Sequence, residues 1–126
     1  MIKIQSVFSG FSVKNIDEAK QFYGDILGFQ FEDQVGGTSM LLPSGNRAWM
    51  YQKKDHEPAT YTMLDLVVDD IDEAYTELTT KGVVFEKYPG SPQDDKGIMR
   101  GKSHNMGPNI AWFKDPSGNI LAIVEL

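Results

Sequence analysis

Ile16-Asp17-Glu18-Ala19 recurs as Ile71-Asp72-Glu73-Ala74, an offset of 71 − 16 = 55 residues. A second tetrapeptide, Pro43-Ser44-Gly45-Asn46, recurs as Pro116-Ser117-Gly118-Asn119, an offset of 116 − 43 = 73 residues. A single repeated tetrapeptide carries little information. Two of them in the same order, each in a matching context, indicate that the chain was built by internal duplication.

Each copy of the first repeat follows a run of alternating apolar residues, at positions 7–13 and 62–68. A period of two predicts a β-strand with one face toward the core. Each repeat begins beside a helix N-cap residue, Asn15 or Asp70, with a glutamate three residues later. Apolar residues then recur at helical spacing, so a helix is predicted after each strand.

Short apolar pieces at residues 28–32 and 82–86 predict the next strand of each half. The Pro-Ser-Gly-Asn segments are typical of hairpin turns, and apolar runs flank both of them. Each half thus has the order strand, helix, strand, strand, strand. We predict an α+β fold, one domain of residues 1–126, made of module 1 (about 1–56) and module 2 (about 60–126).

Residues 88–108 form a predicted loop that has no counterpart in the first half. Loops of this length in compact domains are usually functional lids or disordered segments. The sequence leaves both alternatives open.

Composition excludes several classes of function. The chain has 12 Lys and Arg against 18 Asp and Glu, a formal net charge of −6. An acidic chain lacks the basic footprint that nucleic acids and anionic membranes require, so we expect neither as a partner. It contains no cysteine, which excludes thiolate metal sites and thiol nucleophiles. With no signal-like or membrane-spanning segment apparent, we expect a cytoplasmic protein.

The stretch from Val13 to Tyr23, continued by Leu27-Gly28-Phe29, and the stretch from Trp112 to Asn119 resemble the vicinal oxygen chelate superfamily. This superfamily includes glyoxalase I, extradiol dioxygenases, fosfomycin-resistance enzymes and bleomycin-resistance proteins. The resemblance covers essentially the whole chain. It implies paired βαβββ modules that form a curved mixed sheet around a cleft, and it implies a homodimer.

Metal-dependent members of this superfamily hold a divalent ion on side chains from the first and last strands of each module. Matched onto this sequence, those positions carry Phe8, Met63, Trp49 and Ala122. None offers the imidazole or carboxylate that a hard divalent cation prefers. We therefore expect neither a metal site at these positions nor a bound cofactor.

The alternation of the strands separates the residues that face the helices from those that face the cleft. The predicted ligand pocket is apolar and aromatic with one acid, as small-molecule sites often are. Its predicted residues are Phe8, Trp49, Tyr51, Met63, Asp65 and Ala122. The competing interpretation is that Phe8, Met63 and Ala122 are ordinary core and that the two aromatic residues pack at a dimer interface.

Asp65 interrupts an apolar strand, and a buried carboxylate is costly unless it is paired. It either pairs with a base such as Arg47 or anchors a cationic ligand beside aromatic rings. His104, in the 88–108 loop, is either a solvated histidine or an acid or base that closes over the cleft. Asp65 and His104 are the only candidates for catalysis, and His56, in the linker, is predicted to be inert.

Three functions follow in order of preference. The first is a metal-free protein that binds a cationic or aromatic small molecule, with sequestration as one use of that binding. The second is a lyase, isomerase or dioxygenase-type enzyme of the same superfamily with an atypical site. The third is a non-catalytic interaction module whose cleft is filled by its own side chains.

Overall fold

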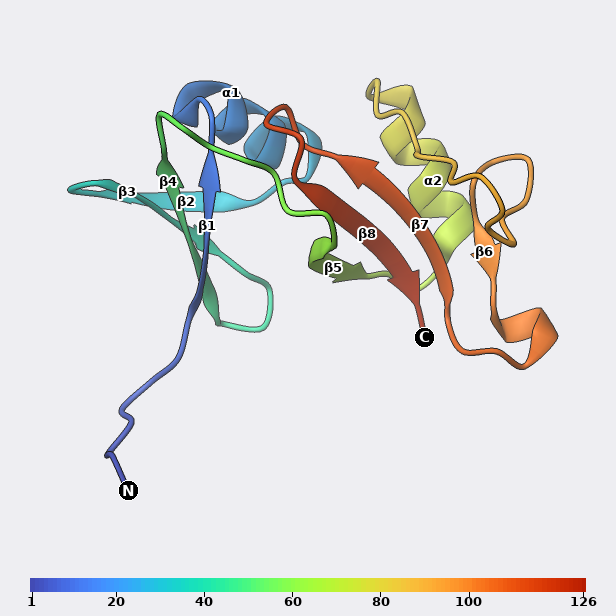
Figure 1. Cartoon of the computed structure of the whole chain (residues 1–126), viewed down its shortest axis with the longest axis horizontal. Coiled ribbons are helices and arrows are strands. Elements are labelled where there is room, and N and C mark those ends of the chain that lie inside the picture. The colour runs from blue at the N-terminus through green and yellow to red at the C-terminus, as the bar shows by residue number, and fades with distance from the viewer. The chain divides into compact units, whose positions relative to one another are not determined.

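The computed structural model describes all 126 residues and divides into two compact units, Met1–Glu57 and Pro58–Leu126. Each unit contains one four-stranded mixed sheet and one principal helix (Figure 1). The predicted α+β class is therefore confirmed.

In the first unit, the sheet has the strand order β1-β4-β3-β2, with β1 parallel to β4 and the other pairs antiparallel. Helix α1 packs against β4 and continues directly into one turn of π-helix, η1. The element bounds are β1 Ser9–Val13, α1 Ile16–Gln21, η1 Phe22–Ile26, β2 Gln30–Gln34, β3 Gly37–Leu41 and β4 Arg47–Gln52.

The second unit has the same plan, with the strand order β5-β8-β7-β6 and β5 parallel to β8. Helix α2 packs against β7 and β8. The element bounds are β5 Thr62–Val67, α2 Ile71–Thr80, β6 Met99–Arg100, the 3-10 turn η2 Lys102–His104, β7 Asn109–Lys114 and β8 Ile120–Glu125.

The strand registers repeat with the offsets of the sequence repeats. Gly10 is the register partner of Trp49 in the first sheet, and Asp65 is the partner of Ala122 in the second. Adding 55 to Gly10 gives 65, and adding 73 to Trp49 gives 122. The duplication read from the two tetrapeptides is thus present in the pairing of the parallel strands.

The starts of the two principal helices are duplicated as well. The side chain of Asn15 accepts a hydrogen bond from the N–H of Glu18 at 2.9 Å, and Asp70 accepts one from Glu73 at 3.0 Å. These contacts satisfy N–H groups that a helix leaves unpaired in its first turn. The predicted caps are confirmed.

A second acceptor at each helix start comes from the end of the adjacent strand. Gln52 Oε1 accepts the N–H of Ile16 at 2.9 Å, and Glu125 Oε2 accepts the N–H of Ile71 at 2.9 Å. The hydrogen bond from Ile71 lowers the pKa of Glu125. The start of α1 is thereby tied to β4, and the start of α2 is tied to β8.

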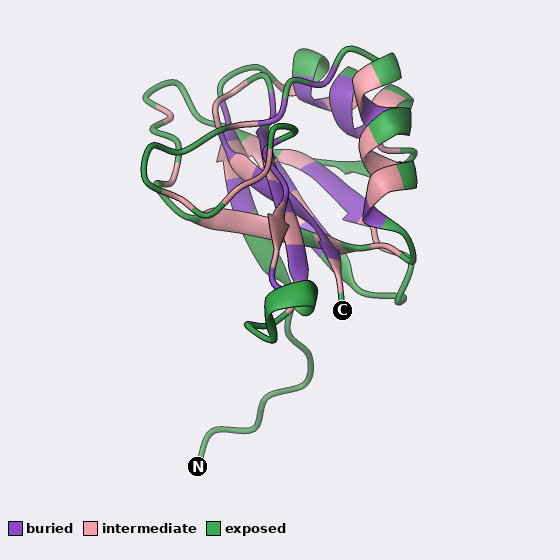
Figure 2. Ribbon diagram, turned by 90° about the vertical axis from the view of Figure 1, so that its right-hand side faces the viewer, coloured by how far each residue is buried: buried purple, intermediate pink, exposed green.

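The cores lie between each sheet and its helix, and Figure 2 shows the buried positions in purple. In the first unit, Tyr23 of η1 is fully buried, and its ring centroid lies 5.7 Å from that of Phe11. In the second unit, Tyr75 stacks on Phe85 at 4.5 Å, and Phe85 meets Phe113 edge-on at 5.6 Å. Aromatic pairs at these separations add to the stabilisation from burial alone.

The strand predicted at residues 82–86 is wrong. Only an isolated bridge joins Phe85 to Phe113 there, and the fourth strand of the second sheet is β6, inside the predicted loop 88–108. The middle of that loop is packed and hydrogen-bonded. Ile98 is fully buried, and Gln93 donates hydrogen bonds to the carbonyl oxygens of Glu86 and Gly97.

The first predicted strand is shorter than the alternating run. Strand β1 begins at Ser9, and Val7, the first residue of the alternating run, is 81% exposed. Alternation shows that a segment can form a strand, but it does not show how far the neighbouring strand extends. Strand β4 begins at Arg47, and the first register pair between β1 and β4 is Ser9 with Ala48. None of the helices is long and apolar enough to cross a membrane.

Candidate ligand site

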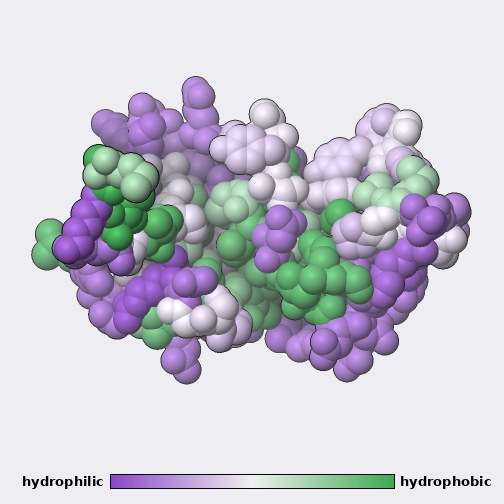
Figure 3. All heavy atoms as spheres, turned by 90° about the horizontal axis from the view of Figure 1, so that it is seen from below, coloured by the Kyte–Doolittle hydropathy of each residue, from purple (hydrophilic) through white to green (hydrophobic).

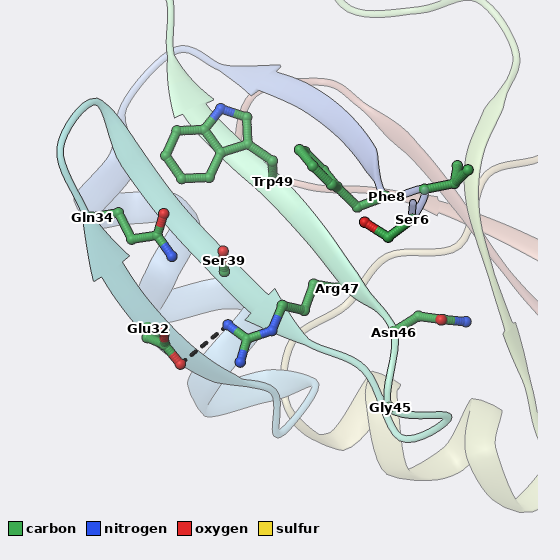
Figure 4. A pocket seen from close by; sticks show the side chains of 10 residues that line it. Ser6, Phe8, Glu32, Gln34, Ser39, Gly45, Asn46, Arg47 and Trp49 are labelled. Atoms are coloured by element: carbon green, nitrogen blue, oxygen red, sulfur yellow. Dashed lines mark ion pairs between the residues drawn. The ribbon is translucent and has the colours of Figure 1, made fainter. Parts of the chain in front are cut away.

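A pocket of about 550 Å³ opens on the face of the first sheet opposite α1 (Figure 4). Its side chains come from β2, β3, β4 and the segment that precedes β1. They stand on one face because alternate residues of a strand point the same way. The principal lining residues are Phe8, Glu32, Gln34, Ser39, Arg47 and Trp49.

Trp49 owes its position to glycines on the neighbouring strands. A Cβ atom at Gly37 of β3 would lie 2.8 Å from Cζ2 of Trp49 and would also clash with the carbonyl oxygen of Met50. On the other side, a Cβ atom at Gly10 of β1 would lie 3.7 Å from Cδ1 of Trp49, an ordinary contact. The indole is therefore held close to the sheet over Gly37 and is partly exposed.

Arg47 and Glu32 face each other across the pocket, with Nη1 of Arg47 3.1 Å from Oε2 of Glu32 (Figure 4). The two side chains are 46% and 55% exposed, so solvent screens the pair and it adds little to stability. An exchangeable ion pair of this kind presents both a cationic and an anionic group to a bound molecule.

The expectation for Asp65 is corrected in one respect. Asp65 lies in β5, as predicted, but it is exposed and not buried, and Arg47 pairs with Glu32. Exposure removes the energetic argument that Asp65 needs a partner, because water solvates its carboxylate.

The structure places the six predicted pocket residues as follows. Phe8, 65% exposed, and Trp49 line the same pocket, while Tyr51 lies further along β4 in register with Ser12. Met63, Asp65 and Ala122 belong to the second unit, in β5 and β8. Whether these residues contact a ligand stays a prediction.

Sequence reasoning did not place Glu32, Ser39 or Arg47 in the pocket. The alternation in β4 places Arg47 on the same face as Trp49, and this signal was available in the sequence. The register of β2 and β3, which brings Glu32 opposite Ser39, was not.

In the second unit, sequence reasoning also missed Trp112. Its indole N–H donates to Oγ1 of Thr62 at 3.1 Å, and its ring meets Tyr88 edge-on. Trp112 is the register partner of Ala122.

His104 is exposed in η2, and its Nδ1 lies 2.9 Å from the carbonyl oxygen of Arg100. His56, predicted to be inert, has its Nδ1 2.6 Å from Oγ of Ser12 in β1. The second contact joins residues 44 apart in the chain, so no local sequence pattern could have predicted it.

The donor chemistry does not fit a divalent metal at the positions used by metal-dependent relatives. Phe8, Trp49, Met63 and Ala122 carry no oxygen or imidazole ligand, and hard cations require such ligands. No three His, Asp or Glu side chains lie close enough together to hold a metal ion.

The family model of the Glyoxalase/Bleomycin resistance protein/Dioxygenase superfamily matches residues 4–123. The chain belongs to this superfamily. A search of curated proteins finds no significant match.

Solved structures share the fold over nearly the whole chain. A superfamily member from Sphaerobacter thermophilus is 25% identical, with a TM-score of 0.66, covering 96% of this chain and 98% of that one. The fosfomycin resistance protein FosX from Listeria monocytogenes is 16% identical, with a TM-score of 0.70 and coverage of 100% and 95%. TnmS3, an antibiotic-binding protein from Streptomyces sp. CB03234, is 22% identical, with a TM-score of 0.61 and coverage of 98% of both chains.

Proposed function

We propose that this protein binds a small aromatic molecule, stacked on Trp49 in the pocket of the first sheet. The observation that carries the proposal is the indole held flat over Gly37 beside the Arg47–Glu32 pair. A flat aromatic surface supplies affinity, and a few polar groups at its edge supply orientation.

The function of one structural relative is consistent with this proposal. TnmS3 is described as an antibiotic-binding protein, and the superfamily description includes bleomycin resistance proteins. We infer that this chain binds its ligand without a metal at the usual positions, since four unsuitable side chains occupy them. Sequestration of a toxic aromatic compound is the biological use that such binding supports.

The second sheet offers a further pair of candidates for contact with a ligand, the exposed Asp65 of β5 and Trp112 of β7. Both are in one register row with Ala122 of β8, which is itself fully buried, and Met63 lies two residues before Asp65. A carboxylate in the same row as an indole favours a cationic group on a ligand. We therefore propose a preference for cationic over anionic aromatic compounds at this row.

The binding proposal is tested by calorimetric titration with acridine orange, a cationic aromatic dye, and with the anionic dye 8-anilinonaphthalene-1-sulfonate. We expect saturable binding that weakens about tenfold or more in Trp49→Leu, the loss of roughly 1.4 kcal/mol of stacking. Tyr61→Leu, which changes an exposed aromatic residue outside both sets of candidates, is the control and should leave this binding in place. No binding of either dye, or equal binding by Trp49→Leu, contradicts the proposal.

Elemental analysis of protein purified without chelator tests the proposal that the ligand is bound without a metal. We expect no stoichiometric divalent metal. One tightly bound metal ion per chain would overturn this proposal and would favour the enzymatic alternative. If neither dye binds, the interaction module is favoured instead.

We also propose that the chain forms a homodimer and works in the cytoplasm. Residues 1–8 are exposed throughout, and the apolar side chains Met1, Ile2 and Ile4 are 126%, 85% and 65% exposed (Figure 2). Hydrophobic residues, drawn in green, also lie among hydrophilic ones on the surface shown in Figure 3. Association would cover such surface. Light scattering of the full chain should give twice the monomer mass, and a monomer at all concentrations would refute the dimer.

A further inference from the structure

Ser12 and His56 bring together a hydroxyl group and a base. Oγ of Ser12 lies 2.6 Å from Nδ1 of His56. A serine within about 2.6–3.2 Å of an imidazole nitrogen has the arrangement found in activated nucleophiles. We propose that Ser12 is a nucleophile with His56 as its base, able to accept an acyl or phosphonyl group from an activated electrophile.

The backbone around this pair is fixed at both ends. Ser12 lies in β1 between Phe11 and Val13, which are 8% and 0% exposed. The N–H of Lys53 donates to the carbonyl oxygen of Val13 at 3.0 Å, and the N–H of His56 donates to the carbonyl oxygen of Lys53 at 3.1 Å. The end of β1 and the turn that carries His56 are therefore linked, so the two side chains meet without searching many conformations.

The pair remains accessible, since both side chains are only partly buried. Ser12 is the register partner of Tyr51, and the alternation of β4 places Tyr51 on the same face as Trp49. A reagent that approaches this face of the first sheet can thus reach Ser12. The inference does not depend on ligand binding in the pocket.

The chemistry is that of acyl transfer. When Nδ1 of His56 carries no proton, the hydroxyl of Ser12 donates to it. As Oγ forms its bond to the carbonyl carbon of an ester, that proton passes to His56. The bond to the leaving alcohol then breaks, and the alcohol departs with the proton from His56. Water, deprotonated by the same nitrogen, hydrolyses the acyl-serine and restores both residues.

The chain holds a matched contrast in Ser103 and His104. Their side chains also approach each other, at 3.1 Å between Oγ and Nδ1. However, Oγ of Ser103 donates to the carbonyl oxygen of Arg100 at 3.1 Å, and Nδ1 of His104 lies 2.9 Å from the same oxygen. A carbonyl only accepts hydrogen bonds, so Nδ1 of His104 carries the proton and cannot accept one from Ser103.

The test uses the wild-type protein and a fluorophosphonate, which forms a stable serine–phosphorus bond as fluoride leaves. Peptide mass spectrometry of the wild-type chain should place the adduct on Ser12. The adduct should be lost in Ser12→Ala and should form at least ~100-fold more slowly in His56→Gln. Ser103→Ala and His104→Gln should label as the wild type does.

Turnover of p-nitrophenyl acetate supplies a second readout, with release of nitrophenolate expected to fall in Ser12→Ala and to persist in His104→Gln. A wild-type protein with no adduct on Ser12 would overturn the proposal, whether or not the variants fold. An adduct on Ser103, or nitrophenolate release unchanged in Ser12→Ala, would overturn it as well.

Discussion

Trp49 lies against the backbone of Gly37, so closely that a Cβ atom at Gly37 would stand 2.8 Å from the indole. The same Cβ atom would also clash with the carbonyl oxygen of Met50, so Gly37→Ala should displace both the indole and this backbone and cost about 1–3 kcal/mol of the free energy of unfolding. Chemical denaturation measures the cost, and a changed Trp49 emission reports the displacement in a Trp112→Phe background.

Gly10→Ala is the matched control, since its Cβ atom would meet Trp49 at ordinary contact distances of 3.6–3.8 Å. This substitution should change the free energy of unfolding by less than about 1 kcal/mol. Equal costs for the two alanine variants would show that the indole does not depend on Gly37.

Arg100 ties the 88–108 segment to helix α2. Its Nη1 and Nη2 donate to Asp72 at 2.8 and 2.7 Å, and its Nε donates to Asp94 at 3.1 Å. The hydrogen bonds from Arg100 lower the pKa of Asp72 to about 2. Burial alone would raise the pKa of Asp94, but hydrogen bonds from Ile98, Arg100 and Lys96 outweigh it and lower that pKa too.

These shifts fix the pH dependence of stability. A carboxyl group whose pKa is lower in the folded than in the unfolded chain stabilises the fold above its unfolded pKa and ceases to do so as pH falls through the folded one. For Asp72 that window runs from about pH 4 down to about pH 2. Stability should therefore decline across this range.

Asp72→Asn should lower the free energy of unfolding at pH 7 by about 1 kcal/mol or less, because solvent screens a side chain that is 48% exposed. The difference from wild type should shrink below pH 4. The exposed Asp95, changed to Ala, is the control and should leave stability nearly unchanged. A difference for Asp72→Asn that is the same at pH 7 and at pH 3 would argue against this account.

The duplicated helix caps predict paired effects. Asn15→Ala and Asp70→Ala should each cost about 0.5–2 kcal/mol, because each removes the acceptor for an N–H in the first turn. Asn15→Asp keeps an acceptor at the same place and should retain most of the stability. Thermal unfolding measures all three, and a neutral Asn15→Ala would show that Gln52 alone suffices to hold the start of α1.

Local and repeated signals made most of the fold predictable. The helix caps, the two hairpin turns and the module order follow from residues close together in sequence, and the two offsets carry through to the strand registers. The missing strand at residues 82–86 shows the limit. The apolar residues of this segment pack against α2 instead, where Phe85 stacks on Tyr75. An apolar segment can therefore be buried without pairing in a sheet.

The candidate site was less predictable, because its features depend on contacts distant in sequence. The face of β4 that carries Trp49 follows from alternation. The partner of Arg47 does not, since Glu32 reaches it only through the register of two other strands. Asp65 looked costly because its neighbours in sequence are apolar, yet an edge strand such as β5 leaves its side chain open to water.

The central claim is that an aromatic molecule stacks on Trp49. The most direct test is a fluorescence titration of the Trp112→Phe variant, in which Trp49 is the only indole, with acridine orange. We predict saturable quenching of Trp49 emission, with the same dissociation constant that calorimetry gives. Quenching that rises linearly without saturation, or that is absent while the dye binds elsewhere, would contradict the claim.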